Sequence, residues 1–185
     1  MPAAYFTIQP NIRNRIAYIM INYFYPNEYV SSVYKINYEA LWQSGIRGLI
    51  FDIDNTLATY DIENPSKEVL KLIRSLSAKG FKICLLSNNN KNRVVLFNKP
   101  LGCKFVFKAK KPSIKGVKLA LKYLNLSTCQ VALIGDQVFT DCLAGNRANV
   151  YTILTKPISK IDEWQVRLKR IPEKVILKLY LKSRK

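Results

Sequence analysis

The sequence contains no histidine and little acid. Its 185 residues include 12 Asp and Glu against 30 Lys and Arg, a formal net charge of +18. Without histidine there is no Ser-His or Cys-His nucleophile and no imidazole ligand for a metal. Catalysis would have to use carboxylates, lysine, hydroxyl or thiol groups, or a hard metal ion. The positive charge is either a solvated basic surface or a sign of anionic partners, such as nucleic acid or an acidic membrane.

Cysteines and long apolar runs are also few. The sequence has four cysteines: Cys84, Cys103, Cys129 and Cys142. None forms a C-x-x-C pair, so we expect neither a zinc site nor a compact disulfide framework, and we predict a reducing, cytoplasmic compartment. The apolar stretch at 16–25 is interrupted by Asn22 and is about half the ~20 residues needed to span a bilayer. The opening residues lack the order of charges and apolar residues found in a signal peptide.

Short apolar runs alternate with helical patterns from residue 46 to about residue 157. Strands are predicted at 47–53, 81–87, 103–107, 130–135 and 149–154. Helices are predicted at 65–79, 91–99, 112–124 and 139–148, the third with Pro112 in its first turn. Near-continuous apolar strands that alternate with helices are typical of a parallel sheet covered on both faces. The sequence therefore predicts an α/β fold with a doubly wound parallel sheet.

The two ends of the chain differ from this central part. We divide the chain into an aromatic-rich N-terminal extension (1–45), an α/β core (46–157) and a basic, amphipathic, helical C-terminal segment (158–185). In the last segment, Lys174, Lys178 and Lys182 recur every four residues and would form one stripe on a helix. Two roles stay open for the end segments: they pack on the core, or they lie on anionic lipid.

Polar residues follow each of the first four predicted strands. In chain order, they are Asp52, Asp54 and Thr56; Ser87, Asn88, Asn89 and Asn90; Lys108, Lys110 and Lys111; and Asp136 and Asp141. The carboxyl ends of parallel strands meet at one edge of a sheet, where α/β proteins bind their ligands. Four carboxylates at one edge call for a cation, most simply Mg²⁺, because the chain has no histidine and no thiolate cluster. Carboxylates, Mg²⁺ and lysine together suit a phosphoryl group, although a structural ion site or surface ion pairs would also fit.

Four short motifs at these strand ends resemble a known superfamily. "DIDNTL", "LLSNNN", "KKP" and "GDQVFTD" resemble, in order, the four motifs of the haloacid-dehalogenase-like (HAD) phosphatases. The longer strings "SNNNKNRV", "PLGCKFVFKAKKP" and "GDQVFTDCLAGNR" are similar to the bacterial YqeG-type subfamily, which is related to the mitochondrial phosphatidylglycerophosphate phosphatases. The resemblance extends from about Met20 into the basic C-terminal helix.

The resemblance implies a role for each motif residue. Asp52 would be the nucleophile that forms an aspartyl-phosphate, and Asp54 the general acid and base. Ser87 and Lys111 would complete the catalytic set, with Lys108 and Lys110 as alternatives to Lys111. Mg²⁺ would be held by Asp52, the backbone carbonyl of Asp54, Asp136 and Asp141. The expected phosphate contacts are Thr56, Ser87, Asn88 and Lys111. Asp61 matches no motif position and is expected on the surface.

The spacing of the motifs also bears on the substrate. Between Asp52 and Ser87, and between Ser87 and Lys111, there is room for one helix each but not for the inserted cap domain of many HAD phosphatases. An uncapped site suits a phosphate carried by something large. The leading hypothesis is a Mg²⁺-dependent phosphatase for phosphatidylglycerophosphate, peripheral on the inner face of the cell membrane. The alternatives are a phosphatase for nucleotides or nucleic-acid ends, and a non-catalytic binding or assembly factor on this fold.

Overall fold

The centre of the molecule is strand β2 (Gly48–Phe51), in which every residue is buried. The computed structural model describes residues 21–159 and 164–183, with side chains of the last helix described from residue 171. An apolar stretch with no polar side chain, such as Leu49-Ile50-Phe51, is stable as a strand only when both faces of its sheet are covered. β2 therefore lies between other strands and between two layers of helices.

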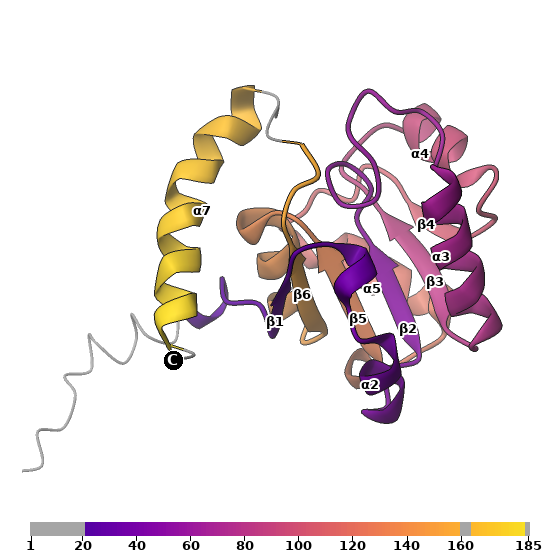
Figure 1. The fold of residues 1–185 in the computed structure, drawn as a ribbon, viewed down its shortest axis with the longest axis horizontal. Helices are drawn as coiled ribbons and strands as arrows, with labels where there is room; N and C mark the ends of the chain where they lie inside the picture. Colours follow the sequence, from indigo (N-terminus) through magenta and orange to yellow (C-terminus); the bar gives the residue numbers. More distant parts are fainter. Residues whose placement is uncertain (1–20, 160–163, 184–185) are drawn as a thin grey trace, which may run out of the picture.

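All strands run parallel in one six-stranded sheet of order β1-β6-β5-β2-β3-β4 (Figure 1). The other strands are β1 (Glu28–Val30), β3 (Lys82–Leu86), β4 (Lys104–Val106), β5 (Val131–Gly135) and β6 (Tyr151–Thr155). The order changes direction at β2, which pairs with β3 on one side and β5 on the other. In doubly wound sheets, this switch point is where the ligand crevice forms.

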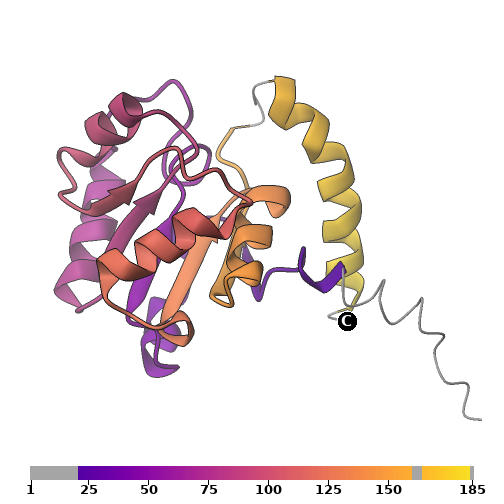
Figure 2. The ribbon, with the colours of Figure 1, turned by 180° about the vertical axis from the view of Figure 1, so that it is seen from behind.

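Helices cover both faces of the sheet, as Figures 1 and 2 show from opposite sides. The first face carries α2 (Tyr38–Gln43), α3 (Lys67–Ala78) and α4 (Lys91–Asn98). The second carries α5 (Ile114–Leu124) and α6 (Leu143–Arg147). Side chains alternate along β2, so that Leu49 and Phe51 join the first apolar cluster and Ile50 joins the second.

The predicted fold class is confirmed, and the five predicted strands and four predicted helical regions are present with shifted ends. Besides a two-residue shift at the start of α3, two helix starts differ from the prediction. α5 begins at Ile114, after the N-cap Ser113, so Pro112 precedes the helix instead of lying in its first turn. The region predicted as one helix at 139–148 begins with a π-helical turn (Val138–Cys142) and continues as α6.

Part of the segment predicted as an N-terminal extension belongs to the sheet and the core. β1 is an edge strand that the sequence analysis did not predict, paired with β6 through Tyr29 and Leu154. A 3-10 turn (Val33–Lys35) follows, and Val33 and Leu41 are buried in the first apolar cluster. The prediction for residues 1–20 lies outside the described residues.

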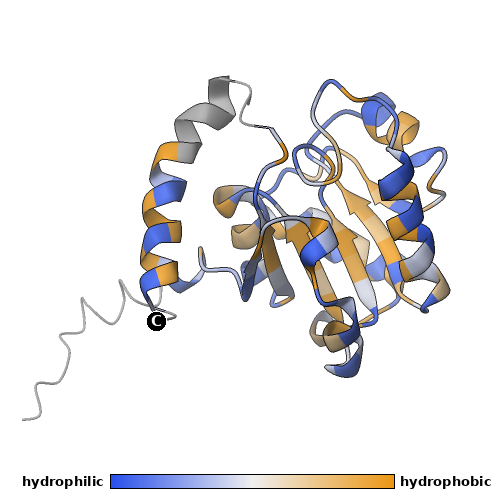
Figure 3. Cartoon of the chain, in the orientation of Figure 1, coloured by the Kyte–Doolittle hydropathy of each residue, from blue (hydrophilic) through white to orange (hydrophobic). Residues whose placement is uncertain are grey.

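The C-terminal helix α7 (Trp164–Ser183) packs beside the β1 and β6 side of the sheet. Its Ile176 and Leu177 contact a small apolar cluster around Val138 and Leu154, and Tyr180 is 5% exposed. Figure 3 shows apolar and hydrophilic residues interleaved along the helix. In the described part of the chain, no helix is both long and apolar enough to cross a membrane.

Candidate active site

The residues that follow the central strands lie together at one edge of the sheet. Asp52 follows β2, Ser87 follows β3 and Asp136 follows β5, while Lys111 lies between β4 and α5. The backbone N–H of Asp52 donates to Ile134 O at 2.9 Å, and that of Ser87 donates to Val106 O at 3.0 Å. These bonds extend the ladder of the sheet by one residue, so the positions of both side chains are set by the sheet.

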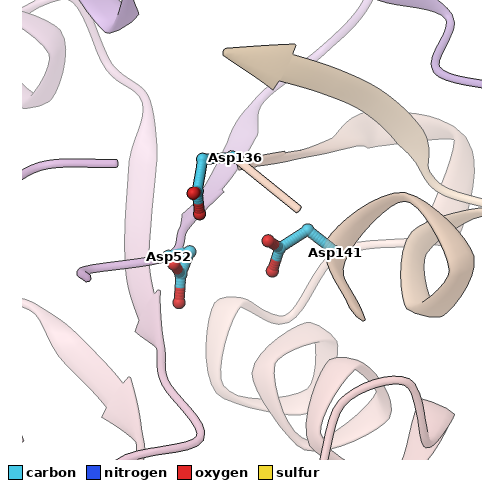
Figure 4. Close-up of side chains that lie close together, drawn as sticks. All are labelled: Asp52, Asp136 and Asp141. Carbon is cyan, nitrogen blue, oxygen red and sulfur yellow. The ribbon is translucent and has the colours of Figure 1, made fainter. Parts of the chain in front are cut away.

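Three aspartates form a buried carboxylate cluster at this edge. Asp52, Asp136 and Asp141 each offer an oxygen within 4.8 Å of the others (Figure 4). Their exposed fractions are 6%, 3% and 1%. Thr56 Oγ1 lies 3.4 Å from Asp52 Oδ2 and 3.4 Å from Asp136 Oδ1. The side chain of Asp54 is not part of this cluster, but it lies at the same edge of the sheet, against Ser87. The metal contact expected of Asp54 was through its backbone carbonyl.

Lys111 supplies the positive charge next to the cluster. Its Nζ donates to Asp52 Oδ1 and Asp141 Oδ1, both at 2.6 Å, and to Leu86 O at 3.0 Å. The side-chain exposure of Lys111 is 3%. Lys108 and Lys110 are exposed. Among the three lysines considered from the sequence, Lys111 is therefore the one that reaches Asp52.

Asn88 holds Lys111 in place. Its Oδ1 accepts from Lys111 N at 2.7 Å, and its Nδ2 donates to Lys111 O at 3.1 Å. The sequence analysis expected Asn88 to contact the substrate phosphate; in the structure, its amide oxygen and one of its two amide N–H groups bond to the Lys111 backbone. Asn88 therefore joins the end of β3 to the loop that carries the lysine.

The buried charges shift each other's pKa values in opposite directions. Burial raises the pKa of Asp52 well above its usual range, Lys111 lowers it, and Asp141 and Asp136 raise it further. Burial by itself would lower the pKa of Lys111, but Asp141 and Asp52 raise it above the usual value. Lys111 is thus held as an ammonium ion, and one ammonium among three carboxylates leaves negative charge that is not compensated.

Asp54 lies beside the cluster in a polar environment of its own. Its Oδ2 accepts from Ser87 Oγ and Asn89 Nδ2, both at 3.3 Å, and its Oδ1 accepts from Arg93 Nη2 at 3.2 Å. The sequence analysis did not assign a role to Asn89 or Arg93. Arg93 lies in the first turn of α4, whose N-cap Asn90 follows β3 closely, and this short connection was the available signal. Asp61 is exposed and outside this group, as expected.

The π-helical turn and a glycine together position Asp141. Asp141 Oδ2 accepts from Gln137 N at 3.1 Å, which ties its carboxylate to the start of the turn. A Cβ on Gly135, the last residue of β5, would lie 2.2 Å from Asp141 Cγ. Only glycine leaves room for Asp141 to fold back over the strand end.

The cluster fits a hard divalent cation. Its ligands are carboxylate oxygens, which Mg²⁺ and similar ions prefer, and its negative charge exceeds what Lys111 compensates. Burial of Asp52 beside two other carboxylates is costly unless a cation is bound. Asp52, Asp136 and Asp141 would hold the ion.

The comparisons with known proteins agree with this geometry. The profile of the family described as "Hydrolase: haloacid dehalogenase-like hydrolase" matches residues 58–149. "Probable phosphatase YqeG" of Bacillus subtilis (strain 168) is 37% identical over 155 residues, covering 84% of this chain and 90% of that protein. The chain belongs to the HAD-like hydrolases, as a YqeG-type phosphatase. The family recognised from the four motifs is confirmed, and so is the prediction that the protein is an enzyme of the phosphatase type.

A more distant relative and a solved structure are also similar to this chain. "Phosphatidylglycerophosphate phosphatase 1, chloroplastic/mitochondrial" of Arabidopsis thaliana is 28% identical over 174 residues. That match covers 85% of this chain, which spans about half (48%) of the length of the plant enzyme. A HAD-family hydrolase of Deinococcus radiodurans R1, solved with bound phosphate and sodium, superimposes with a TM-score of 0.53 at 14% identity. It covers 69% of this chain and 89% of its own, and shows the shared fold.

Proposed function

We propose that this YqeG-type phosphatase is a Mg²⁺-dependent phosphomonoesterase that removes the terminal phosphate of phosphatidylglycerophosphate at a membrane surface. The observation that carries the chemical part is the contact of Lys111 Nζ with both Asp52 and Asp141 at 2.6 Å, within a cluster of three buried carboxylates. This arrangement supports a site in which an ammonium ion and a bound cation both lie near the Asp52 carboxylate.

The reaction has two steps. Asp52 attacks phosphorus, the bond from phosphorus to the alkoxide breaks, and Asp54 gives its proton to the alkoxide, leaving an aspartyl-phosphate on Asp52. Water then attacks the same phosphorus, gives a proton to Asp54 and releases phosphate and the free Asp52 carboxylate. Lys111 and Ser87 stabilise the phosphoryl oxygens. Bound Mg²⁺ would supply further positive charge for Asp52 and the phosphoryl group.

An open site supports a large substrate. The connection from β2 to β3 contains one loop and α3, and the connection from β3 to β4 contains α4, so neither holds an inserted domain. Tyr60, Ile62 and Ile158 are 50%, 45% and 55% exposed. The backbone of Ile158 is bonded to Asn55 O at 3.0 Å, which places it next to the loop that carries Asp54. Exposed apolar side chains around an uncapped site suit contact with lipid.

The outward face of α7 supports a peripheral membrane location. Ile171, Val175 and Leu179 recur every four residues and are 69%, 58% and 42% exposed. Lys174, Lys178 and Lys182 are also exposed, on the same side of the helix. The two roles left open from the sequence are thus compatible, because one face of α7 packs on the core and the opposite face is available to anionic lipid. The name of the plant relative points to the same lipid.

The test is phosphate release from phosphatidylglycerophosphate in mixed micelles, with and without Mg²⁺, compared with nucleoside monophosphates and a 5′-phosphorylated oligonucleotide. We expect the highest kcat/KM for the lipid, dependence on Mg²⁺, and no turnover by Asp52→Asn. A preference for the nucleotide or the oligonucleotide would contradict the lipid substrate and support a phosphatase for nucleotides or nucleic-acid ends. Wild-type function in cells that carry only Asp52→Asn would favour the non-catalytic alternative.

A further inference from the structure

Arg93 lies next to Asp54, with a side chain that is largely shielded from solvent. It is the third residue of α4, and its backbone N–H donates to the N-cap Asn90 Oδ1 at 3.0 Å. The guanidinium Nη2 donates to Asp54 Oδ1 at 3.2 Å and to Thr59 O at 3.3 Å. Its side chain is 10% exposed. One nitrogen therefore joins α4 to two positions in the loop that follows β2.

Among the described residues, the remaining donors of this guanidinium have no hydrogen-bond partner. Nε and Nη1 of Arg93 are buried and unpaired, and the guanidinium lies over the ring of Phe97, 5.3 Å from its centroid. Burial of a charged group with two unmade hydrogen bonds costs stability, and a ring contact offsets only part of that cost. An apolar side chain of similar length would fill the same space without this cost. Stability alone therefore does not explain an arginine at this position.

The contact that Arg93 makes with Asp54 completes the set of donors around that carboxylate. Ser87 and Asn89 hold Oδ2, and Arg93 holds Oδ1. Both oxygens are bonded to groups outside the loop, in the segment that follows β3 and in α4. The carboxylate therefore cannot rotate freely about its Cβ–Cγ bond. Its orientation relative to Asp52 is therefore set from outside the loop that carries both aspartates.

We propose that Arg93 is a positioning residue that holds Asp54 in the orientation required for proton transfer to the leaving group. Its hydrogen bonds go to Asp54 and Thr59 and not to the three clustered aspartates, so it acts through Asp54. The inference rests on the role of Asp54 in the proposed function, but it does not depend on the lipid substrate. Any phosphate monoester with a poor leaving group would require the same orientation.

Leaving-group dependence separates this role from a general structural one. An alkoxide must be protonated as it leaves, whereas nitrophenolate is stable without a proton. A misplaced Asp54 would therefore slow the first step for glycerol 3-phosphate and leave it nearly unchanged for p-nitrophenyl phosphate. The quantity to compare is kcat/KM, because it reports the steps up to phosphoryl transfer and excludes the later hydrolysis of the aspartyl-phosphate.

The experiment measures kcat/KM for both esters in Arg93→Met, Arg93→Lys and Asp54→Asn, with Arg74→Met as the control on an exposed arginine of α3. We expect Arg93→Met to lose about 100-fold on glycerol 3-phosphate and less than about threefold on p-nitrophenyl phosphate. Arg93→Lys should recover part of the loss, and Arg74→Met should resemble the wild type. Adding Arg93→Met to Asp54→Asn should cause no further loss on either ester. Circular dichroism checks that each variant is folded.

Equal losses on the two esters, or no loss on either, would overturn the assignment of Arg93. If Asp54→Asn loses activity selectively on the alkyl ester while Arg93→Met does not, the inference fails and the proposed role of Asp54 stands. If Asp54→Asn shows no selectivity, both fail together.

Discussion

At the scale of single residues, Lys111 joins several parts of the candidate site. Its ammonium contacts Asp52, Asp141 and the carbonyl of Leu86, and its backbone is bonded to both ends of the Asn88 amide. A charge that is buried and paired in this way stabilises its partners, but its removal leaves them buried and unpaired. The lysine is therefore expected to matter for both folding and catalysis.

Replacement of Lys111 with Met should lower kcat/KM about 100-fold to 1,000-fold, because one group that stabilises the phosphoryl charge is lost. It should also lower the free energy of unfolding without Mg²⁺ by about 3–5 kcal/mol, since Asp52 and Asp141 lose their buried partner. Urea denaturation and steady-state kinetics measure the two effects. Lys108→Met, on an exposed lysine of the same loop, is the matched control. A Lys111→Met variant with the activity of the control would refute the role of Lys111.

Gly135 offers a second test at the residue scale. A Cβ at this position would lie 2.2 Å from Asp141 Cγ, so Gly135→Ala should push Asp141 out of the cluster. We expect a stability loss of about 1–3 kcal/mol and weaker Mg²⁺ binding, measured by thermal denaturation and titration calorimetry. In an Asp141→Gly background the same substitution should cost much less stability, because the clashing atoms are absent. An equal cost in both backgrounds would show that Asp141 is not the residue displaced.

The raised pKa of Asp52 predicts how pH and Mg²⁺ act together. In the metal-free folded protein, Asp52 keeps its proton at pH values where the unfolded chain has lost it. Its contribution to stability is therefore present at low pH and lost as pH rises through the folded-state pKa. Mg²⁺ competes with that proton, so the increase in melting temperature caused by Mg²⁺ should grow as pH rises from the usual carboxylate range towards the raised pKa of Asp52. An increase that does not depend on pH, or an equal increase in Asp52→Asn, would contradict this.

At the scale of elements, apolar runs predicted the strands well because a buried parallel strand has no polar face. β2, β3 and β5 match this pattern closely. β1 was missed because Glu28–Val30 is short, half-buried and without any such run. The π-helical turn at Val138–Cys142 was missed because its residues also fit an α-helix, and its extra backbone residue per turn leaves no mark in the sequence.

The candidate site could likewise be predicted from the sequence only in part. The motifs placed Asp52, Asp136, Asp141 and Lys111 together, because strand ends and their order settle which loops meet. They did not show that the Asp54 carboxylate turns to Arg93, or that Asn88 holds the Lys111 backbone. Those features depend on side-chain orientations that the residue types leave open. An amide or a carboxylate side chain at a strand end has several possible hydrogen-bond partners.

The two faces of α7 provide a test at the element scale. Replacement of Ile171, Val175 and Leu179 with Ser on the outward face should leave the melting temperature nearly unchanged and reduce sedimentation with anionic vesicles. Tyr180→Ala on the inward face should lower the free energy of unfolding by about 3 kcal/mol, since Tyr180 is buried against Tyr25. If the outward variant binds vesicles as the wild type does, α7 is not the lipid contact.

At the scale of the whole molecule, the net charge of +18 and the uncapped site both favour a substrate at an anionic membrane surface. A basic protein is attracted to a surface rich in anionic lipid, and this attraction is screened by salt. An uncapped site can then reach a phosphate that stays attached to the bilayer. The charge contributes to location and association rate, whereas the carboxylates and Lys111 determine the chemistry.

Binding to vesicles should therefore depend on both lipid charge and salt. We expect sedimentation with phosphatidylglycerol vesicles at low salt, weaker sedimentation at about 0.5 M salt, and none with neutral phosphatidylcholine vesicles. Equal binding to charged and neutral vesicles would contradict an electrostatic contribution.

The central claim is that Asp52 carries the phosphoryl group during turnover. The most direct measurement is to quench the wild-type protein during hydrolysis of phosphatidylglycerophosphate with Mg²⁺, reduce it with borohydride and map the product by mass spectrometry. Reduction converts an aspartyl-phosphate to homoserine, so we predict homoserine at position 52 and none in Asp52→Asn. Release of phosphate with no homoserine at position 52, or with homoserine at another aspartate, would contradict the claim.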